Sequence, residues 1–298
     1  MSIVYWKELA DHFSSRRFMI LVVLILLTGL WAIFTSGQAI RDVAQQIPTQ
    51  YVFLLLLTSQ PGTVFSLAAF LVFFGPLVGI TLGFDAVSGE YARGTLSRVL
   101  SQPIYRDDLI NGKFLAGLTT VAVFWAAILL IVIGFGISML GFPPNGEELW
   151  RMLIFTVVGI LYVGFWLALA LLFSLLFQRT VTAALASLAV WLFLAIFVGM
   201  IAQAVASFFT SAQVLVETIL SRLSPNILYA DAVRILIDPR GEVLERASRG
   251  QAEGILPTPL DLSQSLLALW PHLTTLFAMV AVCFAIAYIK FMRDEIRA

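Results

Sequence analysis

The chain has 298 residues, of which 60% are hydrophobic and 12% are charged. An ordinary soluble domain carries roughly 25% charged residues, so this composition indicates an integral membrane protein and excludes a soluble one. The 18 basic and 18 acidic residues cancel, and a net charge of zero argues against nucleic acid as a partner. A single cysteine, Cys283, excludes an internal disulfide.

Six long charge-free blocks separate the intervals that hold the charged residues. A charge at the centre of a spanning helix costs about 2.5–3.5 kcal/mol, so the absence of charge across these blocks is what spanning segments require. The blocks predict membrane helices over residues 18–34, 64–84, 114–140, 152–177, 181–205 and 266–289. We therefore expect an all-α integral membrane protein in which residues 1–298 form a single transmembrane domain.

The first 17 residues have the pattern of an amphipathic helix. Ile3, Trp6 and Phe13 recur at helical spacing with charged residues between them, which predicts an interfacial helix over residues 1–17, lying along the bilayer. The alternative is a plain polar tail. The block that follows is longer than the roughly 7–15 apolar residues of a signal peptide, so it is expected to be an uncleaved first span.

A short apolar run, residues 51–57, lies between Pro48 and Pro61. It is too short to cross roughly 30 Å of hydrocarbon as a helix. We expect an external interfacial segment or a preface to the second span, with a re-entrant dip as the alternative.

The second block carries Gly75, Gly79 and Gly83 at every fourth position. This spacing predicts a small-residue face that lets another helix approach closely. The alternative is that glycine is simply common in membrane helices.

The interval of residues 85–113 is the only long polar one in the first half of the chain, and water must lie there because membrane blocks flank it. A short helix with one apolar stripe is predicted from Ala92, Leu96, Val99 and Leu100. Pro103 ends that helix, and a second helix is expected to begin near Tyr105, with Asp107 and Asp108 in its first turn.

Two further connections follow in the second half. Gln178, Arg179 and Thr180 form a turn so short that the fourth and fifth helices must be antiparallel neighbours. Residues 206–261 form the largest polar interval and mix apolar pieces with four prolines. They are expected to be an extracytoplasmic segment of short helices, the first of which dips back into the bilayer, followed by an irregular loop.

Orientation follows from lysine and arginine in the short flanking segments, which gather on one side: Lys7, Arg16, Arg17, Arg93, Arg98, Arg106, Lys113, Arg179, Lys290, Arg293 and Arg297. Positive residues favour the cytoplasmic side of a membrane. Both termini and residues 85–113 are therefore predicted to be cytoplasmic.

The sequence offers no catalytic or metal-binding constellation. Gly112-Lys113 lacks the first glycine and the hydroxyl residue of a phosphate-binding loop. Glu147, Glu148 and Arg151 bear some likeness to the glutamate pair and arginine of intramembrane prenyl-protein proteases. Their spacing is one residue short, however, and the two histidines lie on opposite predicted sides.

His272 follows Pro271 near the start of the last block, where a structural role at the interface is favoured over a ligand role. No acid lies inside a predicted span, which weakens a proton- or sodium-coupled carrier. Energy for transport would then have to come from another subunit.

The residues Phe84-Asp85, Glu90, Gly94-Thr95-Leu96, Leu100, Pro103 and Gly112-Lys113 form a pattern that resembles the cytoplasmic segment after the second span in permease subunits of bacterial type-two (ABC-2-like) ABC exporters. A weaker likeness occurs at Ser224-Pro225 and residues 229–234.

This resemblance implies a permease in the bacterial cytoplasmic membrane, with two such subunits forming the pathway, either two copies of this chain or this chain with a related second permease. Each copy would dock on a separate ATPase subunit that carries ATP and magnesium, while this chain binds no cofactor or metal. The coupling helix, residues 85–103, would meet the ATPase, and the interfacial helix would lie beside it. The residues implied in coupling are Asp85, Glu90, Arg93, Gly94, Thr95, Leu96, Arg98, Leu100 and Pro103.

Within that set, Glu90, Arg93 and Arg98 would meet charges of the partner, and Gly94 would permit close backbone approach. The alternative is that the segment is a solvated connector with balanced charge.

Two other functions stay open at this stage. One is a membrane scaffold of an ATPase-linked assembly, in which residues 206–261 bind an extracytoplasmic partner protein. The other is an ion-coupled carrier. A largely apolar pathway fits lipids, drugs, peptides or a lipid-linked glycan equally, so the sequence names no substrate.

Overall fold

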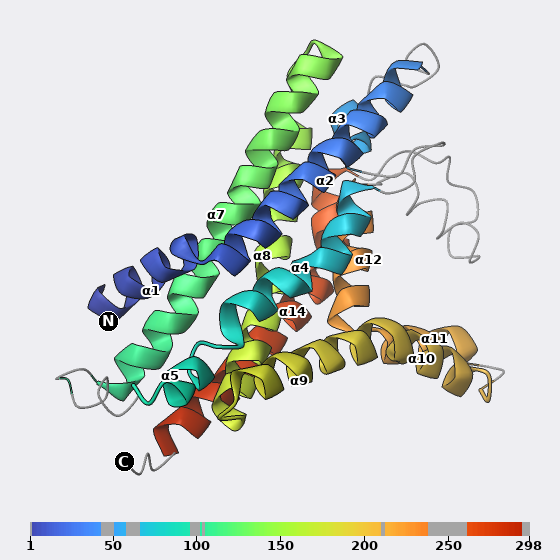
Figure 1. Cartoon of the computed structure of the whole chain (residues 1–298). Helices are drawn as coiled ribbons and strands as arrows, with labels where there is room; N and C mark the ends of the chain where they lie inside the picture. The colour runs from blue at the N-terminus through green and yellow to red at the C-terminus, as the bar shows by residue number, and fades with distance from the viewer. Residues whose placement is uncertain are drawn as a thin grey trace.

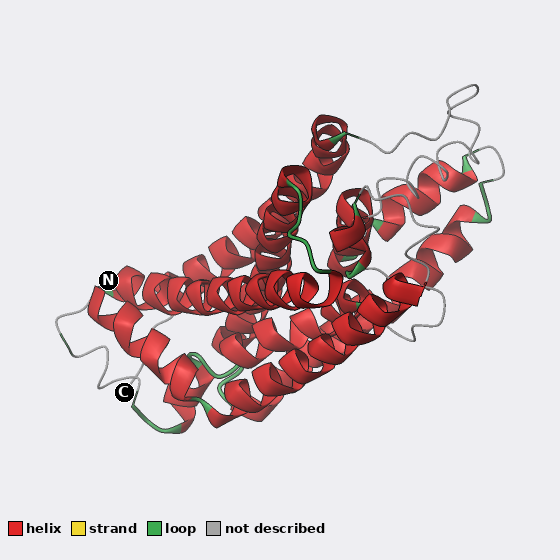
Figure 2. Ribbon diagram, turned by 90° about the horizontal axis from the view of Figure 1, so that it is seen from above, coloured by secondary structure: helices red, strands yellow, loops and turns green. Residues whose placement is uncertain are grey.

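The computed structural model describes residues 2–42, 51–57, 66–95, 102, 105–209, 212–237 and 261–293. Within these ranges every regular element is a helix, as Figure 2 shows, and the predicted all-α class is confirmed. The elements are α1 (Ser2–Ser14), α2 (Arg16–Asp42), α3 (Val52–Leu55), α4 (Leu67–Gly83), α5 (Ser88–Ala92), α7 (Arg106–Leu140), α8 (Gly146–Leu176), α9 (Thr180–Leu192), η1 (Phe193–Phe197), α10 (Val198–Ala206), α11 (Gln213–Ser221), α12 (Pro225–Ile237) and α14 (Leu262–Arg293).

Five helical stretches are long and apolar enough to cross a membrane: α2, α7, α8, the continuous run from α9 through η1 to α10, and α14. The remaining predicted span corresponds to α4, an apolar helix of 17 residues. The count of six spans therefore stays a prediction. Figure 1 shows the N-terminus, the C-terminus and α5 toward the same end of the molecule.

Helix α8 lies at the centre of the bundle and contacts α4, α7, α12 and α14. Its closest neighbour is α4. A Cβ atom built on Gly79 would come within 2.5 Å of the Val163 carbonyl oxygen, and one on Gly83 within 2.7 Å of the Leu167 carbonyl oxygen. On Gly75 it would lie 3.3 Å from the ring of Tyr162. Backbones therefore touch where the glycines allow it.

Pro76 removes one backbone hydrogen bond from α4, and a side chain of α8 replaces that bond. A proline has no N–H, so the carbonyl of Val72, four residues earlier, loses its helical donor. The Tyr162 hydroxyl lies 2.7 Å from that oxygen and 2.7 Å from Oδ1 of Asn226 in α12. The phenol thus links three helices around one carbonyl that would otherwise be unsatisfied.

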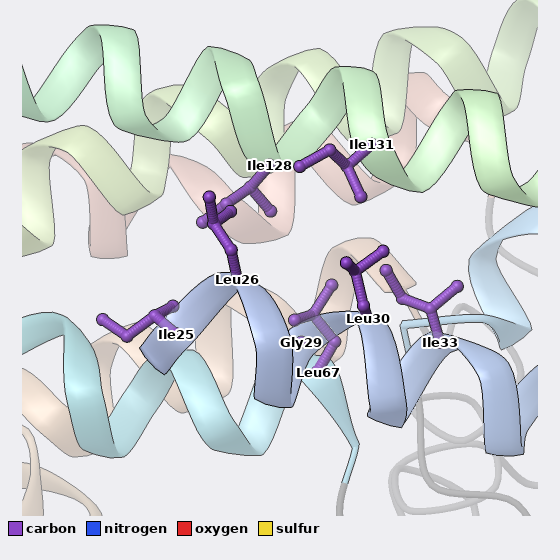
Figure 3. A pocket seen from close by; sticks show the side chains of 8 residues that line it. All are labelled: Ile25, Leu26, Gly29, Leu30, Ile33, Leu67, Ile128 and Ile131. Carbon is purple, nitrogen blue, oxygen red and sulfur yellow. The ribbon is translucent and has the colours of Figure 1, made fainter. Parts of the chain in front are cut away.

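Helix α2 packs on α4 and α7 along an apolar seam (Figure 3). The seam contains a cavity of about 10 Å³ that is lined by Ile25, Leu26, Gly29, Leu30, Ile33, Leu67, Ile128 and Ile131. A cavity of roughly 10–15 Å³ holds one water at most and needs polar partners to do so, so this gap is a packing seam between three helices.

The run α9–η1–α10 is the least covered of the long helices, and Figure 1 shows it diverging from the bundle. Its middle is the five-residue π-helical segment η1, where Phe193 and Phe197 stack with ring centroids 5.7 Å apart and both rings are about half exposed. The Ser224 hydroxyl donates to the Leu194 carbonyl oxygen at 2.8 Å. A carbonyl in a distorted turn is thereby satisfied from outside its own helix.

Within the segment predicted to be extracytoplasmic, residues 206–261, the structure describes the two short helices α11 and α12, and their depth in the membrane stays a prediction. None of the side chains of α11 is buried, whereas α12 packs against α4, α8 and α14. At the start of α12, Tyr229 is fully buried and stacks on Tyr162, with centroids 4.2 Å apart and planes parallel within 1°. Since Tyr162 lies halfway along α8, the start of α12 reaches the middle of the bundle, where its apolar side chains are buried.

The run of residues 51–57 is also buried, and its position relative to the membrane stays a prediction. Phe53 and Leu56 are 0% exposed. The Phe53 ring lies so close to Gly136 of α7 that a Cβ atom there would come within 2.7 Å of it. This run therefore packs into the bundle beside the start of α8, to which α3 also makes contact.

Candidate functional site

The chain turns from α4 into α5 through residues 84–87, and α5 is a helix of five residues. The helix predicted to carry its stripe from Ala92 onward is wrong at its start, because the chain leaves the helical conformation at Gly94, where φ is 65°. The Gly94 amide donates to Tyr91 and the Thr95 amide to Glu90, each at 3.0 Å. This pair of bonds is a Schellman motif, for which glycine is the preferred residue.

The predicted coupling residues are only partly gathered at this turn. Asp85 lies in the turn, 3.4 Å from Arg17 of α2, and Arg93 is exposed at the end of α5. Apart from its two chain neighbours, no described residue lies within 4 Å of a Cβ atom built on Gly94. Leu96, Arg98, Leu100 and Pro103 lie outside the described residues.

Glu90 differs from its expected role, because its side chain points into this chain and not toward a partner. It is 5% exposed, and its Oε1 lies 2.7 Å from Nζ of Lys113 in α7. The same Nζ lies 2.9 Å from Oε1 of Glu8 in α1. We call Glu8, Glu90 and Lys113 the inner cluster.

The charges of the inner cluster can be buried because each has a partner of opposite charge. Loss of Lys113 would leave Glu90 as a buried charge without its partner. The inner cluster joins α1, α5 and α7, three elements that are separate in the sequence. The predicted second helix of the segment is confirmed in α7, with Tyr105 as its N-cap and Asp107 and Asp108 in its first turn.

Burial and nearby charges on α1, α7 and in the turn shift the pKa values of titratable groups at this end of the molecule. Burial acts to raise the pKa of Glu8, but Lys113 and Lys7 outweigh it and hold that pKa below its ordinary value. Burial raises the pKa of Asp85, and Arg17 opposes this incompletely. Burial also lowers the pKa of His12. This end of the molecule therefore holds one well-compensated carboxylate, that of Glu8 in α1, and one poorly compensated carboxylate, that of Asp85 in the turn.

A polar cavity of about 320 Å³ adjoins the inner cluster. It is lined from α1, α2, the turn and α5, and Glu90, Asp85 and Arg93 contribute to its wall. Space of this size next to charged side chains can be filled by water, which would lower the cost of rearranging them.

The amino end of α5 is held by a residue that the sequence analysis did not single out. The Val87 and Ser88 amides each donate to Oγ of Ser174 at 2.9 Å. Ser174 belongs to the last turns of α8 and is 0% exposed. No signal in the sequence pairs positions so far apart.

A second buried charge group, the outer cluster of Glu147, Glu148 and Arg151, lies at the other end of α8. Arg151 is 0% exposed and donates to Glu147 at 2.9 Å, to the Leu236 carbonyl at 3.2 Å and to Ser265 at 3.0 Å. Its guanidinium also lies 5.2 Å from the ring centre of Tyr51. The arrangement ties α8 to α12 and α14, which is a structural task.

Glu148 completes the outer cluster through backbone groups. One carboxylate oxygen accepts from the Phe53 amide at 2.8 Å, and the other accepts from the Asn145 amide at 2.9 Å. Asn145 in turn accepts from the Glu148 amide at 2.8 Å, which is a capping box at the start of α8. The sequence analysis noted these acids and the arginine but not their structural use.

Comparison with known proteins agrees with the resemblance found at residues 84–113. Residues 2–296 match the family described as ABC-2 family transporter protein. A protein of Stutzerimonas stutzeri named "Probable ABC transporter permease protein NosY" is 31% identical over 295 residues, covering 96% of this chain and 96% of that protein. A protein of the same name from Pseudomonas aeruginosa is 28% identical over 274 residues, covering 89% of this chain and 88% of its own length. The chain therefore belongs to the ABC-2 family, whose members are transmembrane permease subunits of ABC transporters.

Proposed function

We propose that this chain is the membrane-spanning subunit of an ATP-driven exporter in the bacterial cytoplasmic membrane. Two copies form the substrate pathway, and each binds a separate ATPase subunit that holds ATP and magnesium. The observation that carries the proposal is the inner cluster, in which Glu8, Glu90 and Lys113 fasten α5 to α1 and α7. A force applied to α5 would act on all three elements together, which is what coupling to an external motor requires.

The proposed topology has six spans, with α4 as the second and both termini in the cytoplasm. The termini and α5 lie toward the same end (Figure 1), and the short segments at that end hold most of the lysine and arginine. An α4 of 17 residues is at the lower limit of length for a span.

The exposed face of the run α9–η1–α10 supports a second copy beside it. Large apolar side chains between 36% and 68% exposed cover this run: Val181, Leu185, Leu192, Phe193, Ile196, Phe197, Met200, Ile201 and Val205. In the proposed dimer, part of this face borders the pathway and the remainder faces lipid.

The test is reconstitution of the permease in proteoliposomes with its proposed ATPase subunit. We expect a complex with two copies of each subunit, and ATP hydrolysis that rises in the presence of the permease. An ATPase variant unable to bind nucleotide is the control. Failure of the two proteins to copurify, or uptake that follows an ion gradient without the ATPase, would overturn the proposal.

A second measurement separates transport from a scaffold role. Flux of fluorescent lipids, dyes and peptides into inside-out vesicles should depend on ATP for at least one probe class. In a Cys283→Ala background, a Ser97→Cys variant should react with an impermeant thiol reagent from the cytoplasmic side only. Labelling of intact cells from outside would show that the topology is wrong.

A further inference from the structure

Helix α5 begins with a cap that comes from another helix. Its N-cap residue, Val87, has no side-chain oxygen, so the first amides need an acceptor from elsewhere. Oγ of Ser174 accepts from both the Val87 and the Ser88 amide at 2.9 Å. The N-cap role normally belongs to the preceding residue of the same chain segment, and here α8 fills it.

Both hydroxyl groups in this contact between α5 and α8 are hydrogen-bonded. The Ser174 hydroxyl donates to Oγ of Ser88 at 3.2 Å, and the Ser88 hydroxyl donates to the Phe84 carbonyl at 2.8 Å. Ser88 and Ser174 are 0% exposed and Val87 is 1% exposed. Separation of α5 from α8 would leave two buried amides without an acceptor, so the two helices are expected to move together.

Helix α8 is built to carry a displacement along its length. Its 31 residues contain no proline and extend about 46 Å at 1.5 Å per residue. Along its inner half it is braced by α4, where Gly79 and Gly83 bring the two backbones into contact with Val163 and Leu167. A stiff helix with this bracing moves as one body.

Helix α8 also contacts α12 near both ends of α12. At the start of α12, Tyr162 lies 2.7 Å from Asn226 and stacks on Tyr229. At the end of α12, Arg151 donates to the carbonyl oxygen of Leu236 at 3.2 Å. A shift of α8 must therefore be followed by α12 or must break these contacts.

We propose that Ser174 is a positioning residue that ties α5 to α8, and that α8 transmits the movement of α5 to α12. This inference rests on the proposed function, because it assumes that an ATPase displaces α5. The chain connects α5 directly to α4 and α7, but α12 is far from α5 in the sequence. The hydroxyl of Ser174 supplies the link from α5 to α8 that covalent connection does not.

The experiment uses the full complex of permease and ATPase in nanodiscs, in a Cys283→Ala background. An environment-sensitive fluorophore is attached at Arg234→Cys, an exposed position on α12. Its signal is compared between the ATP-free state and the state trapped with ADP and vanadate. We expect Ser174→Ala to reduce the nucleotide-dependent change by at least about fivefold, while ATPase binding and basal hydrolysis persist.

Two variants serve as controls. Ser174→Thr keeps the hydroxyl and should restore the signal. Ser187→Ala removes another fully buried hydroxyl, one whose partner among the described residues is the Ala183 carbonyl of its own helix at 2.8 Å, and should leave the signal at the wild-type level.

The results that would overturn this inference differ from the result that would contradict the proposed function. An unchanged signal in Ser174→Ala, or no nucleotide-dependent change at α12 even in the wild type, overturns the inference. Equal loss in Ser174→Ala and Ser187→Ala reduces Ser174 to a packing residue and also overturns it. Failure of the wild-type permease to bind the ATPase is a different result, because it contradicts the proposed function itself.

Discussion

The inner and outer clusters are both buried groups of charged side chains that join helices, but they are completed to different degrees. In the outer cluster both oxygens of Glu148 accept backbone amides, and Arg151 has a carboxylate, a carbonyl and a hydroxyl around it. In the inner cluster Lys113 pairs with both Glu8 and Glu90, and Glu8 has a second cation in the more exposed Lys7, so Glu90 is the less complete of the two carboxylates. The Oε2 of Glu90 has no hydrogen-bond partner among the described residues.

This difference in hydrogen-bond satisfaction indicates what each end of the molecule is suited for. A fully satisfied buried network is rigid and costly to open. A network with an incomplete carboxylate beside a cavity of about 320 Å³ has a cheaper alternative, since water or another cation can replace Lys113. The outer end is therefore suited to holding α12 in place on α8, and the inner end to rearranging when a partner acts on it.

The largest effect is expected from Arg151→Met. Removal of the guanidinium leaves Glu147 buried in part and the Leu236 carbonyl without its donor, which should cost about 3–5 kcal/mol. Thermal unfolding of the purified protein in detergent measures it. The stability of Arg151→Lys, which keeps the charge but loses the forked geometry of the guanidinium, should lie between the stabilities of the wild type and Arg151→Met. Wild-type stability of Arg151→Met would show that the cluster is dispensable.

Lys113→Met should destabilise less, by about 2–3 kcal/mol, because Glu8 keeps its pair with Lys7 and Glu90 can take up a proton or water from the cavity. The triple variant Glu8→Gln, Lys113→Met, Glu90→Gln removes every charge and should recover most of that loss. The same thermal assay compares them. A triple variant as unstable as Lys113→Met would contradict an electrostatic origin.

The glycine contacts between the two ends can be tested with a matched pair. Gly79→Ala places a Cβ atom 2.5 Å from the Val163 carbonyl oxygen, and should cost about 1–3 kcal/mol as the helices separate. A Cβ atom built on Gly134 in α7 has no side chain or other helix of the described residues within 4 Å, so Gly134→Ala should be neutral or slightly stabilising. Equal thermal stability of the two variants would favour the view that these glycines have no packing role.

The carbonyl freed by Pro76 allows a finer test at the middle of α8. Tyr162→Phe should cost about 1 kcal/mol by removing the hydroxyl that lies 2.7 Å from the Val72 oxygen. In a Pro76→Ala background an amide replaces that donor, so the same change should cost less. A double-mutant cycle measured by unfolding gives the coupling, and an equal cost in both backgrounds would mean that the hydroxyl serves Asn226 instead.

The smallest effect is a pH dependence from Glu8. Because its pKa is lowered in the folded protein, Glu8 stabilises above its ordinary pKa of 4.5, and that contribution is lost as pH falls through the folded value. The stability difference between wild type and Glu8→Gln should therefore be full at pH 7 and shrink below about pH 4. A difference that grew in acid would mean that the carboxylate is not stabilised by Lys113.

The sequence predicts the parts of this fold that depend on local chemistry. Charge-free blocks mark the helices, because a buried charge is expensive in a membrane, and the start of α7 at Arg106 follows from its flanking signals. The signal for the end of α5 was also present in Gly94, since glycine commonly closes a helix. The apolar spacing of Leu96, Val99 and Leu100 lies outside the described residues, so a helix over those positions stays a prediction.

The rest depends on contacts between distant residues. Lys113 and Glu8 are 105 positions apart, and nothing in either neighbourhood marks them as a pair. The same is true of Ser174 and Ser88, 86 positions apart. For α12, an amphipathic helix beside prolines looks alike whether it lies on a membrane or within a bundle, and only the partner surface on α8 decides.

The π-helical segment η1 has a consequence for how this family member tolerates change in length. One extra residue in a helical turn rotates everything beyond it by about 100° relative to the half before it. Removal of a single residue such as Ala195 would restore ordinary helical phase but swing α10 around its axis and carry Ser224 away from Leu194. Within this stretch a one-residue deletion should therefore harm the protein more than most substitutions, because it would misdirect a whole helix while leaving the composition of the membrane segment almost unchanged.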